Sequence, residues 1–137
     1  MVTLAPGIHG SLTVTEPGLT IKGQPGAVIR ATDWTAVKIV ADNVTLDGLT
    51  IEGGNFGVFI TNARGVVVQN CDISGASWAG VMIASDDGPA HANTIRNCKV
   101  HDNTHEGIYV KGNCRGNVIE HNDVYQNGDE GIQNTHC

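Results

Sequence analysis

Aromatic residues are scarce in this sequence, and their scarcity limits what the interior can be made of. Phe, Trp and Tyr together make up 4% of the 137 residues, although hydrophobic residues reach 40%. The core must therefore be built from Val, Ile, Leu, Ala and Cys. Glycine is abundant by contrast, at 18 residues. Glycine-rich turns between β-branched segments are typical of many short strands in one modest domain.

Long apolar runs are also missing. No stretch approaches the roughly 18 apolar residues that a membrane-spanning helix needs, so we expect no membrane partner. The start, MVTLAPGIHG, has neither the basic segment nor the long apolar segment of a signal peptide. The chain is therefore either cytoplasmic or one from which a leader has been removed. Of the two, we expect a secreted or periplasmic location.

Basic residues are few. Eight Lys and Arg stand against fourteen Asp and Glu, which gives a formal net charge of −6. Nucleic-acid binding requires a basic face, and these scattered residues do not make one, so we expect no nucleic-acid partner. A polyanionic substrate would need locally placed basic residues or a bridging cation.

A repeat organises the rest of the sequence. LTIKG at 19–23 returns as LTIEG at 49–53. The later units have a period of 22 to 27 residues and can be written in register over 44–60, 66–83, 93–110 and 117–134. Apolar residues share columns in this register: Leu46, Val68, Ile95 and Ile119; Ile51, Ile73, Val100 and Val124; Val58, Val81, Ile108 and Ile132. A glycine column marks a bend before the last strand: Gly57, Gly80, Gly107 and Gly131.

Each repeat predicts three short strands with period-two alternation and no helix. One unit cannot bury its own apolar face, whereas stacked units can, with each strand pairing in parallel with its copy in the next turn. We therefore predict an all-β fold, a single right-handed parallel β-helix of about five turns with three strands per turn. Residues 1–43 would form irregular first turns or an N-terminal cap, and residues 44–137 the regular repeats. Two asparagine ladders are expected at the turns, Asn70 with Asn97 and Asn103 with Asn127.

The end of the sequence stops in the middle of a repeat, at GIQNTHC. An open end of a solenoid exposes unpaired strand edges, which favour association. We expect either a fragment of a longer β-helix or a homo-oligomer that pairs end to end through this turn.

The sequence resembles the pectate-lyase-like β-helix superfamily over nearly its whole length. A loose signature, Ile followed at fixed spacing by Val, Asn and Gly-Ile, runs from Ile95 to Ile108 and again from Ile119 to Ile132. The resemblance implies the fold directly and a carbohydrate-active function as an expectation, because one fold hosts many functions.

The outward positions of the last strand carry the candidate site residues. One outward column, expected to face solvent, contains Phe59, Met82, Tyr109 and Gln133, and Lys111 falls in the next. Glu106 lies at the bend, Glu130 is its copy one turn on, and Asp129 is adjacent. His105 should stack near Asp129. Stacked carboxylates about 5 Å apart repel unless a cation or proton lies between them. Glu106, Glu130 and Asp129 are therefore a candidate Ca²⁺ site, with a solvated acidic edge as the alternative.

The resemblance adds a mechanism. In the alginate and chondroitin lyases of the superfamily a calcium-binding Glu is followed five residues later by a Lys base, and Glu106 and Lys111 match that spacing. Arg115 would bind the carboxylate of the substrate, and Trp78, if exposed, would stack on a pyranose face. The uronate epimerases of the superfamily imply a second possibility, with His101 and Tyr125 as base and acid. A histidine simply stacked on a tyrosine is the alternative.

A lengthened polar turn and four cysteines are the remaining candidates for a metal site or a disulfide. Asp86, Asp87 and His91 in a lengthened turn either bind a cation or form an ordinary polar turn. The four cysteines include no CxxC pair, which argues against a zinc site of the usual spacing. Two of them, Cys71 and Cys98, share an inward column and should be buried thiols. The other two, Cys114 and Cys137, would bridge in an oxidising compartment.

Taken together, these features predict a carbohydrate-active β-helix domain that acts on an acidic polysaccharide by β-elimination or epimerisation. Ca²⁺ is the expected metal, and no organic cofactor is expected. The alternative is a non-catalytic solenoid that binds glycans or supports a larger assembly.

Overall fold

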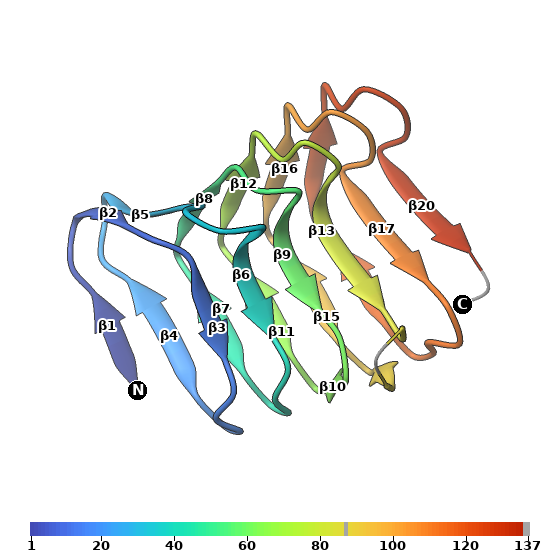
Figure 1. Cartoon of the computed structure of the whole chain (residues 1–137), viewed down its shortest axis with the longest axis horizontal. Coiled ribbons are helices and arrows are strands. Elements are labelled where there is room, and N and C mark those ends of the chain that lie inside the picture. Colours follow the sequence, from blue (N-terminus) through green and yellow to red (C-terminus); the bar gives the residue numbers. More distant parts are fainter. Residues whose placement is uncertain (87, 136–137) are drawn as a thin grey trace.

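The structure, a computed structural model, describes residues 1–86 and 88–135. Strands and turns account for all the secondary structure of the described residues, and none of them belongs to a helix that could cross a membrane. Three parallel sheets of six strands wind around one axis (Figure 1). Six stacked strands per sheet correspond to about five steps of the coil, with three strands per turn. The right-handed parallel β-helix predicted from the repeat is confirmed.

The chain passes through the three sheets in the same order in every turn. Sheet A contains β1 (Val2–Leu4), β4 (Thr20–Gly23), β7 (Thr45–Asp47), β11 (Val67–Gln69), β15 (Thr94–Arg96) and β18 (Val118–Glu120). Sheet B contains β2 (Gly7–His9), β5 (Ala27–Arg30), β8 (Thr50–Glu52), β12 (Asp72–Ser74), β16 (Lys99–His101) and β19 (Asp123–Tyr125). Sheet C contains β3 (Leu12–Val14), β6 (Thr35–Ile39), β9 (Phe56–Ile60), β13 (Ala79–Ala84), β17 (Ile108–Lys111) and β20 (Ile132–Thr135). A separate pair joins β10 (Ala63–Arg64) to β14 (Ala90–His91).

The core lies inside the coil and is formed by the repeat columns. Val68 of β11 pairs with Leu46 on one side and Ile95 on the other, and all three are fully buried. Burial of one such side chain contributes about 1.5–3 kcal/mol, and every turn supplies several. Residues 1–43 contribute the strands β1 to β6, which stack in the same three sheets.

Asparagines stabilise the turns between sheets. The predicted ladder of Asn103 with Asn127 is present, since the Asn103 Nδ2 donates to the Asn127 Oδ1 at 3.0 Å. Asn70 and Asn97 share a left-handed backbone, with φ of 55° and 53°. The Asn70 amide donates to Asp47 at 3.0 Å, so a shared turn conformation explains this column.

Two buried thiols occupy the inward column predicted for them. Cys71 and Cys98 are free and almost fully buried. The hydrogen bond between them, followed by burial, raises the pKa of the Cys71 thiol well above its ordinary value. Cys71 is therefore a hydrophobic core residue rather than a nucleophile. The predicted pair of Cys114 with Cys137 cannot be placed, because Cys137 lies outside the described residues.

Exposed apolar side chains gather in the first and last turns. Val2 and Ile8 are exposed in β1 and β2, and Val118, Tyr125 and Ile132 are exposed in β18, β19 and β20. These strands also carry the outer edges of the three sheets. Association through such edges stays a prediction of the sequence.

Candidate functional site

One column of residues runs along the axis at the bend before sheet C. Asn55 N donates to Trp34 O at 2.7 Å, Trp78 N to Asn55 O at 3.0 Å, His105 N to Trp78 O at 2.9 Å, and Asp129 N to His105 O at 2.9 Å. These five residues, one from each successive turn, are called the bend column below. Trp34 is 57% exposed and Trp78 is 49% exposed. The column therefore presents two indoles to solvent, two turns apart.

The C-terminal part of the bend column opens into a depression of about 620 Å³. Its lining comprises Trp78, His105, Glu106, Tyr109, Gly128, Asp129, Glu130 and Gln133. Six of the candidate site residues thus border one hollow: Trp78, Glu106, Tyr109, Asp129, Glu130 and Gln133. They converge because the bend and the outward face of β17 and β20 meet there.

Acidic groups and one imidazole dominate this depression. Glu106 is only 5% exposed, and its Oε1 accepts a hydrogen bond from the Trp78 Nε1 at 3.3 Å. His105 Nδ1 donates to Asp129 Oδ2 at 2.6 Å. Ligand atoms of His105, Glu106 and Asp129 lie within 4.8 Å of one another. The predicted metal set included Glu130, which lines the depression but is not one of these three, and it omitted His105.

The outer face of sheet C carries a second column, in which Lys38, Phe59, Met82, Tyr109 and Gln133 pair in register. The Lys38 ammonium lies 5.7 Å from the centre of the Phe59 ring. Met82 was expected to face solvent but is only 3% exposed. It packs in a small apolar cluster outside the main core, against which Phe59 and Tyr109 lie. The middle of this face is therefore apolar and closed.

Two predicted basic residues lie outside the depression. Lys111 shares the outer face of β17 with Tyr109, and its Nζ pairs with the Asp86 carboxylate at 3.3 Å. Arg115 lines a separate pocket of about 240 Å³. His91 Nδ1 accepts a hydrogen bond from the Arg115 backbone N–H at 3.0 Å. The cation site expected at Asp86, Asp87 and His91 cannot be assessed, because Asp87 lies outside the described residues.

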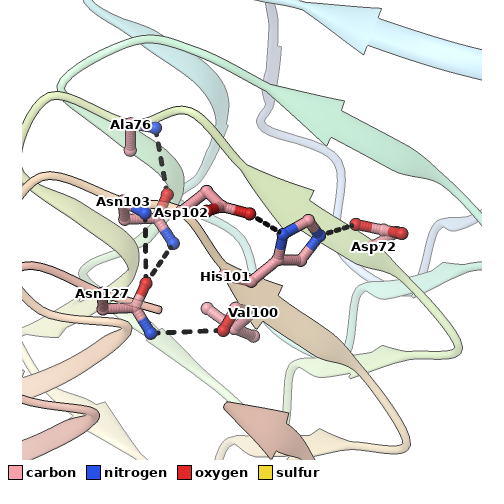
Figure 2. A network of polar contacts seen from close by, with 7 residues as sticks. All are labelled: Asp72, Ala76, Val100, His101, Asp102, Asn103 and Asn127. Carbon is pink, nitrogen blue, oxygen red and sulfur yellow. Dashed lines mark hydrogen bonds and ion pairs between the residues drawn. The ribbon is translucent and has the colours of Figure 1, made fainter. Parts of the chain in front are cut away.

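His101 lies on sheet B, in a different environment from Tyr109. Its Nε2 donates to Asp72 at 2.6 Å and its Nδ1 to Asp102 at 2.5 Å, as Figure 2 shows. The ring also stacks on Tyr125, with centroids 4.8 Å apart and an interplanar angle of 2°. An ionised carboxylate can only accept from an imidazole, so the two contacts favour the form of His101 in which both nitrogens carry a proton. In that form the imidazole has no lone pair free to act as a base.

The stability of the protein should depend on the charge of His101. Burial lowers the pKa of His101, the hydrogen bonds to Asp102 and Asp72 raise it, and the net pKa lies above its usual value. The stability that His101 contributes is thus complete below the unfolded-state pKa of about 6.5 and is lost as pH rises through the folded-state pKa. We expect the free energy of unfolding of the wild type, relative to His101→Gln, to fall over that window. Urea denaturation from pH 5 to 9 measures it. His121→Asn, at an exposed histidine, is the control, and a pH-independent difference for His101→Gln would contradict the assignment.

Comparison with known proteins places the chain among β-helices. Residues 15–136 match the family described as "Right handed beta helix region". A cell surface glycoprotein of Methanothermus fervidus is 29% identical over 139 residues, which cover 96% of this chain and 23% of that protein. The crystal structure of an alginate lyase from Paenibacillus sp. str. FPU-7 superposes with a TM-score of 0.63 at 21% identity, covering 98% of this chain and 57% of the lyase. The chain spans about a quarter of the curated relative, and the likeness to the lyase establishes the fold alone.

Proposed function

The chain belongs to the right handed beta helix family, and from this premise we propose that it is a carbohydrate-active domain that binds an acidic polysaccharide along the outer side of sheet C. The observation that carries the proposal is the bend column, with the exposed indoles of Trp34 and Trp78 in one line leading to the depression. Indole faces offer large, rigid apolar surfaces with a polar edge, which suits the faces of pyranose rings.

The spacing of the indoles favours a polymer that lies parallel to the axis. Trp34 and Trp78 are two turns apart in the bend column, and two strand spacings amount to about 10 Å. Sugar units in an extended chain could then contact both indoles at once. Because the scaffold between them is a stacked sheet, the platforms are fixed before the ligand arrives, which reduces the entropy cost of binding.

The charges favour an acidic polymer with a cation bound beside it. Lys38 and Lys111 lie on the outer face of sheet C, where their ammonium groups can approach uronate carboxylates. The depression itself carries Glu106, Asp129 and Glu130, which repel a polyanion. A divalent cation at these carboxylates would reverse the local charge and bridge to the ligand.

β-Elimination is the reaction that this face would support. Tyr109 lines the depression, and Lys111 follows it on the same outer face of β17. In such a step a base removes the proton α to the uronate carboxyl group, the bond from the β-carbon to the glycosidic oxygen breaks, and a carbon–carbon double bond forms. An acid protonates the departing oxygen. Lys111 as the base would have to exchange its Asp86 partner for the substrate.

A location outside the cell accords with this function. The curated relative is a cell surface glycoprotein, and polysaccharides of uronic acids occur outside the cytoplasm. We propose an extracellular or cell-surface setting for the domain.

One experiment tests both binding and action. The protein is mixed with a panel of polyuronates and neutral glycans, with divalent cation or with chelator, and co-sedimentation is measured together with the ultraviolet absorbance of unsaturated products. We expect binding of polyuronates only, reduced by chelator. An absorbance rise that Lys111→Ala abolishes would establish the lyase, and binding without a rise would establish a binding domain. Absence of polyuronate binding would end the proposal.

A further inference from the structure

The side chains of His105, Glu106 and Asp129 form a compact group with the composition of a transition-metal site. We infer that they hold a divalent first-row metal ion, of the zinc type, through the His105 Nδ1 and one carboxylate oxygen each from Glu106 and Asp129. The inference deepens the proposed function, because it supplies the cation that an acidic polysaccharide requires at this depression.

The distances are close to those around a shared ion. The three ligand atoms lie within 4.8 Å of one another, whereas the ligand atoms of a tetrahedral zinc ion are about 3.4 Å apart. The His105 and Asp129 side chains are both substantially exposed, so small rotations close the difference. Their present contact, 2.6 Å from Nδ1 to the carboxylate, is bridged by a proton. A metal ion would take the place of that proton.

The burial of Glu106 provides an independent reason. A carboxylate that is 5% exposed needs compensation for the water it has lost. Among the described residues its side chain has one hydrogen-bond donor, the Trp78 indole at 3.3 Å. A neutral donor at that distance compensates a buried charge weakly, whereas a bound cation compensates it well. The same indole links the metal position to the glycan platform.

The donor set selects the kind of ion. Calcium prefers six to eight oxygen ligands, and an imidazole nitrogen is foreign to such a site. One imidazole and two carboxylates suit zinc or its neighbours and neutralise their charge. The group borders the open depression, so a fourth position would face solvent. A water molecule or a uronate oxygen can occupy it, which is how the ion would bridge to the polysaccharide.

The test uses cobalt as a coloured substitute for zinc. The intact chain is titrated with Co²⁺ while the visible d–d absorption is followed. Zn²⁺ is then added to displace the Co²⁺. A parallel sample receives Ca²⁺, the ion expected from the sequence, as the competitor. We expect saturable absorption that Zn²⁺ removes and Ca²⁺ does not. Both His105→Gln and Glu106→Gln should weaken Co²⁺ binding at least tenfold, because loss of a mere outer-shell partner already costs about 10- to 100-fold. His121→Asn, at an exposed histidine outside the depression, should leave it unchanged.

The outcomes separate this inference from the proposed function. Unchanged Co²⁺ binding in His105→Gln, no saturable binding, or Ca²⁺ binding that Glu130→Gln abolishes would overturn the metal assignment. Thermal melts of the variants exclude misfolding as the cause of a loss, and His105→Gln, on an exposed side chain, remains informative if Glu106→Gln is unstable. If polyuronate binding does not change when chelator is added, the proposed function stands and the role of the metal in it is refuted. If the protein binds metal but no polyuronate, the metal site stands and the proposed function is refuted.

Discussion

Trp78→Ala is expected to weaken binding of an acidic polysaccharide by about 2 kcal/mol, or about thirtyfold in Kd, as for an aromatic residue at the centre of an interface. The substitution removes the more central of the two exposed indoles of the bend column, at the edge of the depression. It also removes the N–H that hydrogen-bonds to the buried Glu106 carboxylate. Isothermal titration with a purified polyuronate fraction measures the change, and a thermal melt shows whether the fold is retained.

Two matched variants separate the parts of this effect. Trp78→Phe keeps an aromatic face and loses the N–H, so it should retain much of the affinity for glycan if stacking dominates. Trp34→Ala removes the indole two turns away. It should weaken binding of long chains and leave short oligosaccharides, which cannot span both indoles, nearly unaffected. A Kd for Trp78→Ala equal to that of the wild type on every chain length would show that the polymer binds elsewhere.

The inward-facing residues of the strands could be predicted from the sequence, because the fold restricts which side chains fit at these positions. Stacked turns require apolar side chains at fixed intervals, so the spacing of Leu46, Val68 and Ile95 in the sequence predicts that they pair. The glycine column could be read for the same reason. The asparagine ladder of Asn103 with Asn127 follows from the same register. The side-chain amide of Asn70, by contrast, donates to Asp47 and not to the predicted partner, Asn97.

The outward half was harder, because its side chains are free to lean across turns. Strict alternation put Met82 in solvent, yet flanking aromatic residues cover it. The two carboxylates that engage His101 come from the preceding turn and from the next residue, a geometry that register alone does not fix. The sequence predicts His105 as a neighbour of Asp129 but does not group it with Glu106, because neighbouring residues of a strand usually point to opposite faces. The bend interrupts that alternation and turns both toward one hollow.

Gly80→Ala is expected to cost about 3 kcal/mol of stability, the upper end of the range for overpacking a tight site. A Cβ at Gly80 would lie 2.7 Å from the Asn103 Nδ2, 2.7 Å from the Val100 Cγ1 and 2.9 Å from the Gly107 carbonyl oxygen. The first belongs to the asparagine ladder and the last to the next turn's backbone, so neither can withdraw without breaking hydrogen bonds. Urea denaturation at constant pH measures the loss as a lower midpoint with an unchanged slope.

The same glycine column supplies the control. A Cβ at Gly131 would meet nothing closer than the Val124 Cγ1, at 3.5 Å. Gly131→Ala should therefore be neutral, or stabilising by up to about 1 kcal/mol through the unfolded state. Equal losses for the two variants would show that close stacking around Gly80 is not the cause of the loss.

Gly80 N also donates to the Glu106 carbonyl at 3.2 Å, so a shift of that strand would move Glu106. Gly80→Ala should then weaken cobalt binding in the fraction that remains folded, whereas Gly131→Ala should not, which ties the packing of the coil to the geometry of the candidate metal site.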